Sequence, residues 1–371
     1  MNPNISIAVI GAGAISQSVH LPSLRRAGFD IHYVCDLSPT RATGVAASVG
    51  AQAITDPSEA LADPTVDAVL IATSGSHTQL TLAALGAGKH VLAEKPLAFT
   101  AREVREIAEL AQQQQRIVQV GYMKMHDPLT TIAAQEVAAM ERLRLVRVTV
   151  SHPADEPQIS HLRLGAAPTD ADAAAIAAAQ AYDQARAIEA LPGADESLLR
   201  YYTDVLNGSV IHEFSLLRAM GLPLPASWHA RTIVDGNEPP SLLATAAVDH
   251  TAYILSWNWL PDYPEYHEEL VLLAANARLE FQLAKPYLLE ERSTLISRRH
   301  QGALRTDTTY TDGHDTGFIR QLDAFAQAIA TGTSPDPTLA GATADIAGLQ
   351  ALAQAIAHSR GIQIQTEASN S

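Results

Sequence analysis

The sequence has one cysteine, few aromatic residues and few basic residues, and these shortages exclude several classes of protein. Cys35 stands alone among 371 residues, so neither a disulfide framework nor a cysteine-based zinc site is expected. The 25 basic residues are outnumbered by 40 acidic ones, and the net charge of −15 disfavours nucleic acid as a partner. No apolar run reaches the roughly 18 residues of a membrane span. We therefore expect binding to neither nucleic acid nor membrane.

The N-terminus and the histidines exclude two further features. The first residues, MNPNISIAVIGAG, lack the basic region and the cleavage site of a secretory signal, so a cytoplasmic location is expected. The 14 histidines are scattered, and none has the spacing of metal ligands on one element. The sequence therefore predicts no metal site.

Strand-like and helix-like segments alternate along residues 1–125. The apolar runs ISIAVIG, DIHYVCD, DAVLIAT, KHVLAEKP and RIVQVGY read as buried strands. Helix-like segments lie between several of them, and two of these segments end at Gly28 and Gly88. This alternation predicts the α/β class, with a doubly wound parallel sheet that forms a Rossmann domain over residues 1–125.

Extended segments dominate residues 126–371, which we expect to form a second, α+β domain. RLVRVTVSH, SWHARTIVD, LLATAAVDH, AYILSWNWL, EELVLLAA and ARLEFQL follow one another with short turns, as in a mostly antiparallel open sheet. Two helices are expected near 315–331 and 338–359. Residues 153–205 interrupt the pattern with an alanine-rich, helix-like stretch. This segment could be a lid, an oligomer contact or a surface helix.

A glycine-rich loop, GAGAIS, follows the first strand and opens a helix. Gly11 allows a tight turn, and Gly13 allows the backbone to approach a pyrophosphate. Ser16 takes the third position, where glycine is usual, so the motif is imperfect. Ala14 and Ile15 complete the loop, and we count both among the expected cofactor-binding residues.

Asp36 ends the second strand, 20 residues after Ser16. An acid at this point accepts hydrogen bonds from ribose hydroxyls and repels a 2′-phosphate, which favours NAD over NADP. Arg41 lies nearby and favours NADP, so NADP remains an alternative to NAD. Asp36 could instead initiate the turn DLSP.

Two more loops follow strands of the expected parallel sheet, at the edge where ligands collect. The first is ATSGSH, which places Thr73, Ser74 and His77 at the cofactor, and the second is AEKP, which places Glu94 and Lys95 there. A desolvated lysine beside a positive nicotinamide ring has a lowered pKa and suits proton handling. The competing interpretation is an ordinary solvated lysine at the end of a strand.

In their order and spacing, GAGAIS, IATSGSH, ALGAGKHVLAEKPLA and GYMKMHDP resemble the Gfo/Idh/MocA family of glucose–fructose oxidoreductase and inositol dehydrogenase. The resemblance is close over the first 128 residues and loose beyond them. It implies NAD(P)-dependent oxidation or reduction of a secondary alcohol, typically of a sugar or cyclitol. It also implies a catalytic Lys95 beside the nicotinamide and the substrate hydroxyl, and a homodimer or homotetramer formed through the second-domain sheet.

The resemblance implies a catalytic and substrate-binding histidine in the second domain, for which His212 is the counterpart. The family has an aspartate four residues earlier, where this chain has Gly208. Asp204, Asn207 and Glu213 are nearby acids or amides, and none matches the aspartate's position. If Ser209 caps a helix, His212 lies in its first turn, where the helix dipole keeps the ring neutral. A purely structural histidine is the alternative.

The segment GYMKMHDP supplies three expected substrate contacts, Tyr122, Lys124 and His126. Met125 and His126 replace the arginine and tyrosine that are usual in the family, which suggests an altered pocket. An interdomain hinge without ligand contacts is equally compatible with this sequence. Further aromatic residues could stack on a sugar ring or pack in the sheet: Trp257, Trp259, Tyr263 and Tyr287.

The sequence thus leads to three hypotheses of function. The first is an NAD(P)-dependent dehydrogenase of a sugar, glycoside or cyclitol, in which His212 removes the hydroxyl proton and Lys95 stabilises the developing alkoxide. The second is a redox-neutral, NAD-dependent glycosidase that oxidises its substrate only transiently. The third is a non-catalytic sensor of NAD(H), which the missing aspartate before His212 favours.

Overall fold

The computed structural model describes residues 5–162, 164, 168–311, 313, 315–333 and 338–367. The chain divides into two compact units. The first combines Met1–Met123, Leu164–Ala190 and Phe318–Ile346, and the second combines Lys124–Arg163, Leu191–Gly317 and Ala347–Ser371. The expected domain division had one break, at residue 125, whereas both of these units are discontinuous in sequence. Within the described ranges, no helix is long and apolar enough to cross a membrane.

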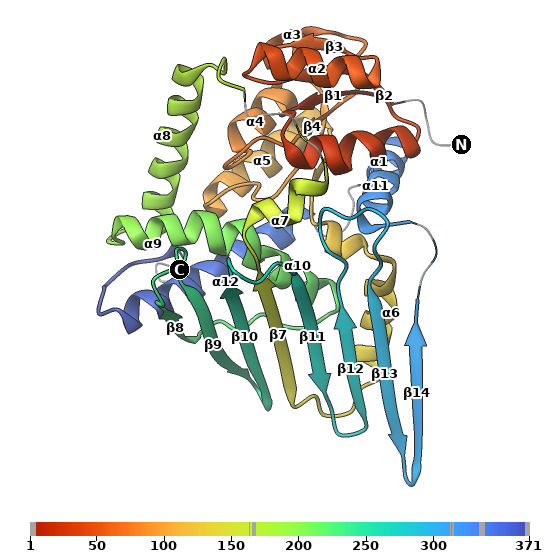
Figure 1. Ribbon diagram of the computed structural model, residues 1–371, viewed down its shortest axis with the longest axis vertical. Helices are drawn as coiled ribbons and strands as arrows, with labels where there is room; N and C mark the ends of the chain where they lie inside the picture. The colour runs from red at the N-terminus through yellow and green to blue at the C-terminus, as the bar shows by residue number, and fades with distance from the viewer. Residues whose placement is uncertain are drawn as a thin grey trace. The chain divides into compact units, whose positions relative to one another are not determined.

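The first unit contains a six-stranded parallel sheet in the order β3-β2-β1-β4-β5-β6. Its strands β1, β2, β3 and β4 are labelled in Figure 1. Its central strands are apolar and fully buried, as expected for a sheet covered on both faces. The strands are β1 Ser6–Ile10, β2 Asp30–Cys35, β3 Gln52–Ile54, β4 Ala68–Ile71, β5 His90–Ala93 and β6 Val118–Val120. This is the doubly wound sheet that the sequence predicts.

Helices separate the strands of the first unit, and their ends follow ordinary capping chemistry. Thr100 and Glu103 form a reciprocal capping box at the start of α5. Ser38 caps α2, because its hydroxyl accepts a hydrogen bond from the Arg41 N–H at 3.1 Å. The helices are a π-helix Ser16–His20, α1 Leu21–Arg26, α2 Pro39–Val49, α3 Pro57–Ala62, α4 Thr78–Gly86, α5 Ala101–Gln114, α8 Ala173–Ala190 and α11 Gly317–Thr331.

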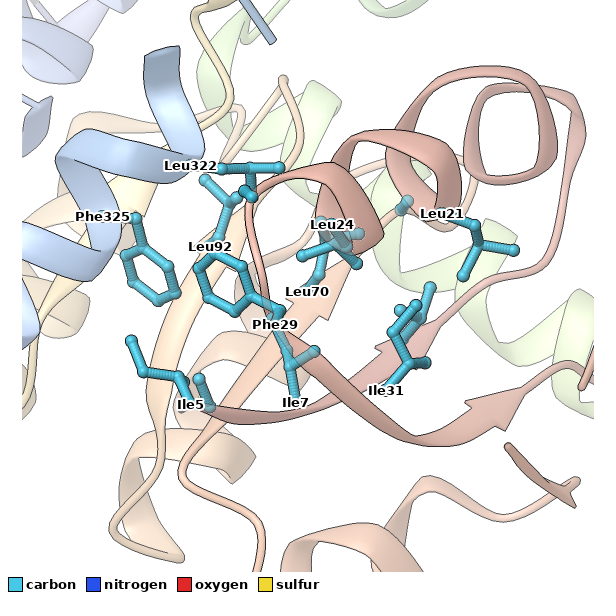
Figure 2. Packing of buried hydrophobic residues seen from close by; sticks show 14 of the residues in the cluster. Ile5, Ile7, Leu21, Leu24, Phe29, Ile31, Leu70, Leu92, Leu322 and Phe325 are labelled. Atoms are coloured by element: carbon cyan, nitrogen blue, oxygen red, sulfur yellow. The ribbon is translucent and has the colours of Figure 1, made fainter. Parts of the chain in front are cut away.

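A hydrophobic core joins the parallel sheet to a helix from late in the chain. Figure 2 shows Leu322 and Phe325 of α11 beside Phe29 and Leu92 of the first unit. Leu322 and Phe325 are fully buried. Residues about 300 positions apart thus share one core, which explains why the first unit is discontinuous in sequence.

The second unit contains an eight-stranded sheet in the order β14-β13-β12-β11-β7-β10-β9-β8. All pairs are antiparallel except β7 with β10, so the expected mostly antiparallel sheet is confirmed. The strands are β7 Leu145–His152, β8 His229–Ile233, β9 Ser241–Val248, β10 Thr251–Trp259, β11 His267–Leu273, β12 Ala277–Gln282, β13 Thr294–Gln301 and β14 Leu304–Tyr310. Strands β13 and β14 were not predicted from the sequence.

The remaining helices include one that corrects an expectation. α9 Glu196–Tyr201, a π-helix Tyr202–Val210 and α10 Ile211–Ala219 follow one another without leaving helical backbone, and Asp195 caps the first of them. The predicted helix start at Ser209 is therefore wrong. The other helices are a 3₁₀ turn Met123–His126, α6 Pro128–Ala138, α7 Asp155–Ile159, a 3₁₀ turn Ser160–Leu162 and α12 Thr338–Ser359.

Candidate cofactor and active site

The glycine-rich loop follows β1 and is held by backbone and side-chain hydrogen bonds. The Gly11 N–H donates to the Cys35 carbonyl at 2.8 Å, and the Ser16 hydroxyl donates back to the Gly11 carbonyl at 2.5 Å. Gly11 has a φ of +98°, and a Cβ there would lie 2.5 Å from the Ala72 carbonyl oxygen. Ser16 is fully buried. The serine in the third position of the motif therefore stabilises the turn and leaves no side chain in the way of a ligand.

Gly13 meets the geometric requirement of a pyrophosphate site. Apart from its chain neighbours, no atom of the described residues would lie within 4 Å of a Cβ at Gly13, so the backbone of the loop faces open space. Ala14 and Ile15 lie at the start of the following helix, where N–H groups have no acceptor within the helix. The helix dipole favours an anion at this end. The loop thus fits the phosphates of a dinucleotide.

Asp36, at the end of β2, organises the loop from the side. Its Oδ2 accepts a hydrogen bond from the Ala12 N–H at 3.0 Å, and its Oδ1 accepts one from the Ser38 N–H at 2.9 Å. Arg41 Nη1 lies 3.6 Å from Oδ2. The hydrogen bond from Ser38 corresponds to the turn-forming role of Asp36, one of the two alternatives that the sequence left open. Each carboxylate oxygen still has a lone pair that can accept from a ribose hydroxyl.

His77 links the loop after β4 to the loop after β5. Its Nδ1 lies 2.7 Å from the Pro96 carbonyl oxygen and its Nε2 lies 3.2 Å from the Thr73 carbonyl oxygen. The ring is buried, and burial lowers its pKa against the raising effect of these carbonyls. His77 therefore holds Thr73, and the loop that continues through Ser74, against the segment that follows Lys95.

Glu94 and His20 form a buried hydrogen-bonded pair that was not predicted from the sequence. Oε1 of Glu94 lies 2.8 Å from Nε2 of His20, which ends the π-helix after the glycine-rich loop. Burial raises the pKa of Glu94, but the hydrogen bond and charge of His20 and the charge of Lys95 outweigh burial and lower it. Oε2 accepts from the Lys95 N–H at 3.2 Å. The pair thus connects the phosphate loop to the backbone that carries Lys95.

The second unit contains a buried charge cluster around Lys124. Its ammonium lies 2.9 Å from Glu213 Oε1 and 2.6 and 2.7 Å from the two oxygens of Glu268. The Tyr266 hydroxyl donates to Glu268 at 2.6 Å. Lys124 is 5% exposed, and these carboxylates can use all three of its N–H donors. The cluster joins the 3₁₀ turn Met123–His126 to α10 and β11.

His212 lies in the interior of a long helix and not in its first turn. The predicted buried stripe is present, since Val210, Phe214 and Leu217 are all at most 2% exposed, and His212 is half-buried. The predicted effect of the helix dipole on the His212 ring is wrong, because the helix begins at Glu196. Lys95 belongs to the first unit and His212 to the second.

The other residues near His212 have partners of their own. Glu213 contacts Lys124, the Asn207 amide donates to the Tyr202 carbonyl at 2.9 Å, and Asp204 is exposed and accepts from the Thr203 hydroxyl. Each of these three side chains thus has a partner other than the His212 ring. We therefore assign to none of them the role of the aspartate that the resemblance implies.

His126 and Tyr122 differ in their surroundings. Burial lowers the pKa of His126 to about 4, so its ring is neutral at neutral pH and can accept a hydrogen bond. Tyr122 is 1% exposed and belongs to the first unit. Among the described residues, no group of three or more His, Cys, Asp or Glu could hold a metal ion.

The aromatic residues of β10 and its neighbours form a cluster inside the second unit. Trp257 is 3% exposed and donates from Nε1 to the Ser209 hydroxyl at 2.9 Å. Trp259 stacks on it with ring centroids 6.3 Å apart, and His152 lies 5.5 Å from Trp259. Tyr263 is 49% exposed. Packing, one of the two alternatives for these residues, accounts for Trp257.

Part of the first unit is similar in sequence to known proteins. Residues 5–122 match a family model, GFO_IDH_MocA, described as "Oxidoreductase family, NAD-binding Rossmann fold". The inositol 2-dehydrogenase of Mycolicibacterium smegmatis is 42% identical over 132 residues, which are 34% of this chain and 37% of that protein. The match thus spans little more than a third of the length of such relatives. The predicted resemblance is confirmed over this part of the chain.

Two solved structures share the architecture of nearly the whole chain. A levoglucosan dehydrogenase in complex with NADH and levoglucosan has a TM-score of 0.71 at 15% identity and covers 97% of this chain and 98% of its own. KijD10, a 3-ketoreductase from Actinomadura kijaniata in complex with NADP and TDP-benzene, has a TM-score of 0.67 at 17% identity, with 96% and 98% covered. At such identities the likeness establishes the fold alone, and the two neighbours hold different nicotinamide cofactors.

Proposed function

We propose that this chain, whose residues 5–122 belong to the Gfo/Idh/MocA oxidoreductases with an NAD-binding Rossmann fold, is an NAD-dependent dehydrogenase. Its substrate is a secondary alcohol of a sugar, glycoside or cyclitol. One observation carries the proposal: the open face of Gly13 and the Lys95 loop lie at the carboxyl ends of β1 and β5 in the same parallel sheet. Ligands of such sheets collect at that edge.

The residues of the first unit hold the cofactor in this proposal. The N–H groups of Ala14 and Ile15 bind the pyrophosphate beside Gly13, and Asp36 accepts hydrogen bonds from ribose hydroxyls. Thr73 and Ser74 line the same edge of the sheet. His77 and Glu94 act less directly, since their side chains hold the loops that carry Thr73 and Lys95.

His212 and Lys95 share the chemistry of the substrate hydroxyl. Bound NAD supplies the hydride acceptor, the C4 atom of its nicotinamide ring. His212 accepts the proton of the hydroxyl as a general base. Lys95 donates a hydrogen bond to the same oxygen and stabilises the negative charge that develops there. Tyr122 and His126 contact other hydroxyls of the substrate, and the neutral ring of His126 suits an acceptor role.

Lys124 takes a different role from the substrate contact that the sequence suggested. Its three N–H donors face carboxylate oxygens of Glu213 and Glu268, which supports a structural role. In this proposal Lys124 orders the turn that carries His126 and the helix that carries His212.

The proposed assembly is a cytoplasmic homodimer or homotetramer that uses the open face of the eight-stranded sheet. Along β9, β10 and β13, residues of the open face alternate with buried residues. The open face presents Leu243, which is 45% exposed, together with the half-buried Ile254 and Ile296. Light scattering on purified protein measures the mass directly. A monomer at micromolar concentration would contradict this part of the proposal.

The test of the proposed function is the absorbance of NADH at 340 nm. Purified protein is incubated with NAD or NADP and a panel of aldoses, inositols and glycosides. A rise with one class of substrate supports the dehydrogenase and names its substrate. A flat trace with release of free sugar would favour the redox-neutral glycosidase, and a flat trace with nucleotide binding alone would favour the sensor.

A further inference from the structure

Asp170 lies at the N-terminus of α2, beside the end of β2. Its Oδ1 accepts a hydrogen bond from the Ser38 hydroxyl at 2.5 Å, and its Oδ2 accepts from both the Thr40 N–H at 3.0 Å and the Thr40 hydroxyl at 2.6 Å. These bonds lower the pKa of the Asp170 carboxyl to about 2, so it is ionised. An anion from a distant part of the sequence thus occupies the positive end of this helix.

The segment 168–190, which we call the strap, has a second attachment to the same unit. The Ser76 hydroxyl donates to Asp183 Oδ1 at 2.6 Å, in the loop after β4. Asp183 lies so close to Gly75 that a Cβ at Gly75 would be 1.9 Å from its Oδ2. The strap, which includes α8 (green in Figure 1), also bonds to α5, through Tyr182 to Glu103 at 2.9 Å.

One of the two attachments, that of Asp170, lies on the side of the sheet where the adenosine half of a dinucleotide would bind. The two attachments join the loops after β2 and β4, and β1 with its glycine-rich loop lies between these strands in the sheet. A dinucleotide in such a sheet extends from the loop after the first strand toward the acid at the end of the second. Asp170 therefore lies on the side where the adenosine ribose and its 2′ position are expected.

Without Asp170, the start of α2 has the groups that bind a 2′-phosphate. The hydroxyls of Ser38 and Thr40 and the Thr40 N–H are hydrogen-bond donors, and the Arg41 side chain lies beside them, 3.6 Å from Asp36. Arg41 also offsets the charge of Asp36, so Asp36 alone repels a phosphate less strongly. Asp170 accepts from three of these donors and adds a second negative charge.

We propose that Asp170 is a specificity-determining residue that excludes NADP, because its carboxylate fills the anion site that the 2′-phosphate would need. The inference rests on the proposed function, since it concerns the same nucleotide site. It assigns a role to part of the insertion at 153–205: the strap completes the nucleotide site of the first unit from outside the Rossmann sequence.

The test compares nucleotide binding by the full-length protein and two charge variants. Asp170→Asn removes the charge and keeps the size of the side chain. Asp172→Asn is the matched control, because it removes the same charge two residues away, and asparagine can still cap α8 as Asp172 does. Calorimetry measures the dissociation constants of NAD and NADP, and of 5′-AMP and 2′,5′-ADP, which probe the adenosine end alone.

We expect the wild type to bind NAD more tightly than NADP, and 5′-AMP more tightly than 2′,5′-ADP. Asp170→Asn should shift both ratios toward the 2′-phosphorylated ligand by roughly five- to thirty-fold, while Asp172→Asn leaves them nearly unchanged. Equal shifts in the two variants, or none in Asp170→Asn, would overturn the role of Asp170 and leave the proposed function standing. A wild type that binds no nucleotide would overturn the proposed function and this inference with it.

Discussion

At the scale of single residues, the cluster around Lys124 has one more carboxylate than it has cations. Glu213 and Glu268 are at most 2% exposed, and Oε2 of Glu213 is buried without a hydrogen-bond partner among the residues that the structure describes. Burial is the main cause that raises the pKa of Glu213, to about 7, and Lys124 offsets only part of it. A proton on Glu213 makes the cluster neutral.

The cluster predicts a pH dependence of stability. The pKa of Glu213 in the folded state, about 7, lies above its ordinary value of 4.5. The folded state therefore holds this proton more tightly, and the resulting stability is present below about pH 4.5 and is lost as pH rises through about 7. We expect the free energy of unfolding of the wild type to fall by roughly 1–3 kcal/mol relative to Glu213→Gln between about pH 5 and 8.

Urea denaturation of both proteins at several pH values measures this difference. The Glu213→Gln variant serves as the baseline for the wild type, because the two proteins share every other titrating group. Parallel pH profiles for the wild type and Glu213→Gln would show that Glu213 does not titrate in this range.

A second prediction at this scale concerns His212. If it is the general base, His212→Ala lowers kcat by about 10²–10⁴-fold, because the proton then lacks a positioned acceptor. The dissociation constant of NAD should change little, since the proposed cofactor-binding residues all belong to the first unit. Steady-state kinetics and calorimetry separate the two effects, and an unaltered kcat would remove His212 from the proposed mechanism.

At the scale of elements, the two glycines of the glycine-rich loop meet different requirements: Gly11 is needed for folding, and Gly13 for cofactor binding. Gly11→Ala should destabilise the protein by about 1–3 kcal/mol, because Gly11 has a φ of +98° and its Cβ would lie 2.5 Å from a carbonyl oxygen. Gly13→Ala should leave stability within about 1 kcal/mol of the wild type, because no described residue beyond its chain neighbours lies within 4 Å of the new Cβ. It should nevertheless weaken NAD binding, since the methyl group takes the space of the pyrophosphate.

Thermal or urea unfolding and calorimetric titration of the two variants check this contrast. Normal NAD affinity in Gly13→Ala would indicate that the phosphates lie elsewhere.

Elements of the parallel sheet could be predicted because their signal is local. Runs such as AVLIA (68–72) are continuously apolar, and the structure buries β4 completely. β13 and β14 were missed because they form the edge of the second sheet, where TLISRRHQ and LRTDTTY alternate mostly polar residues and β14 is largely exposed. The false helix start at Ser209 came from a residue with a good capping side chain, which instead accepts a bond from Trp257 within a helix that continues through π-helical turns.

The candidate site could be predicted in part for the same reason. Gly11, Gly13, Asp36 and Lys95 follow strands whose order is readable. The contacts of His20 and Asp170 were not predicted, because their partners, Glu94 and Thr40, lie 74 and 130 positions away and nothing local in the sequence marks such pairs.

At the scale of the whole molecule, the first unit depends on segments from three parts of the chain. Leu322 of α11 is fully buried in the core of the parallel sheet. Leu322→Ala should therefore cost roughly 2–5 kcal/mol of stability. Gln327→Ala, at an exposed position of the same helix, is the control and should change stability by less than about 0.5 kcal/mol.

Urea unfolding followed by the binding of NAD tells whether the loss falls on the first unit. Equal stabilities for the Leu322 and Gln327 variants would mean that α11 contributes little to the core.

The contact between Gly75 and Asp183 couples two positions 108 residues apart, so the effect of a substitution at one depends on the other. A side chain at Gly75 collides with Asp183, whereas removal of Asp183 takes away the partner of Ser76. The two losses overlap, so Gly75→Ala with Asp183→Gly should cost less than the sum of the single changes. Which substitutions position 75 tolerates therefore depends on the strap as well as on the loop. The insertion thus restricts how the Rossmann loop can evolve.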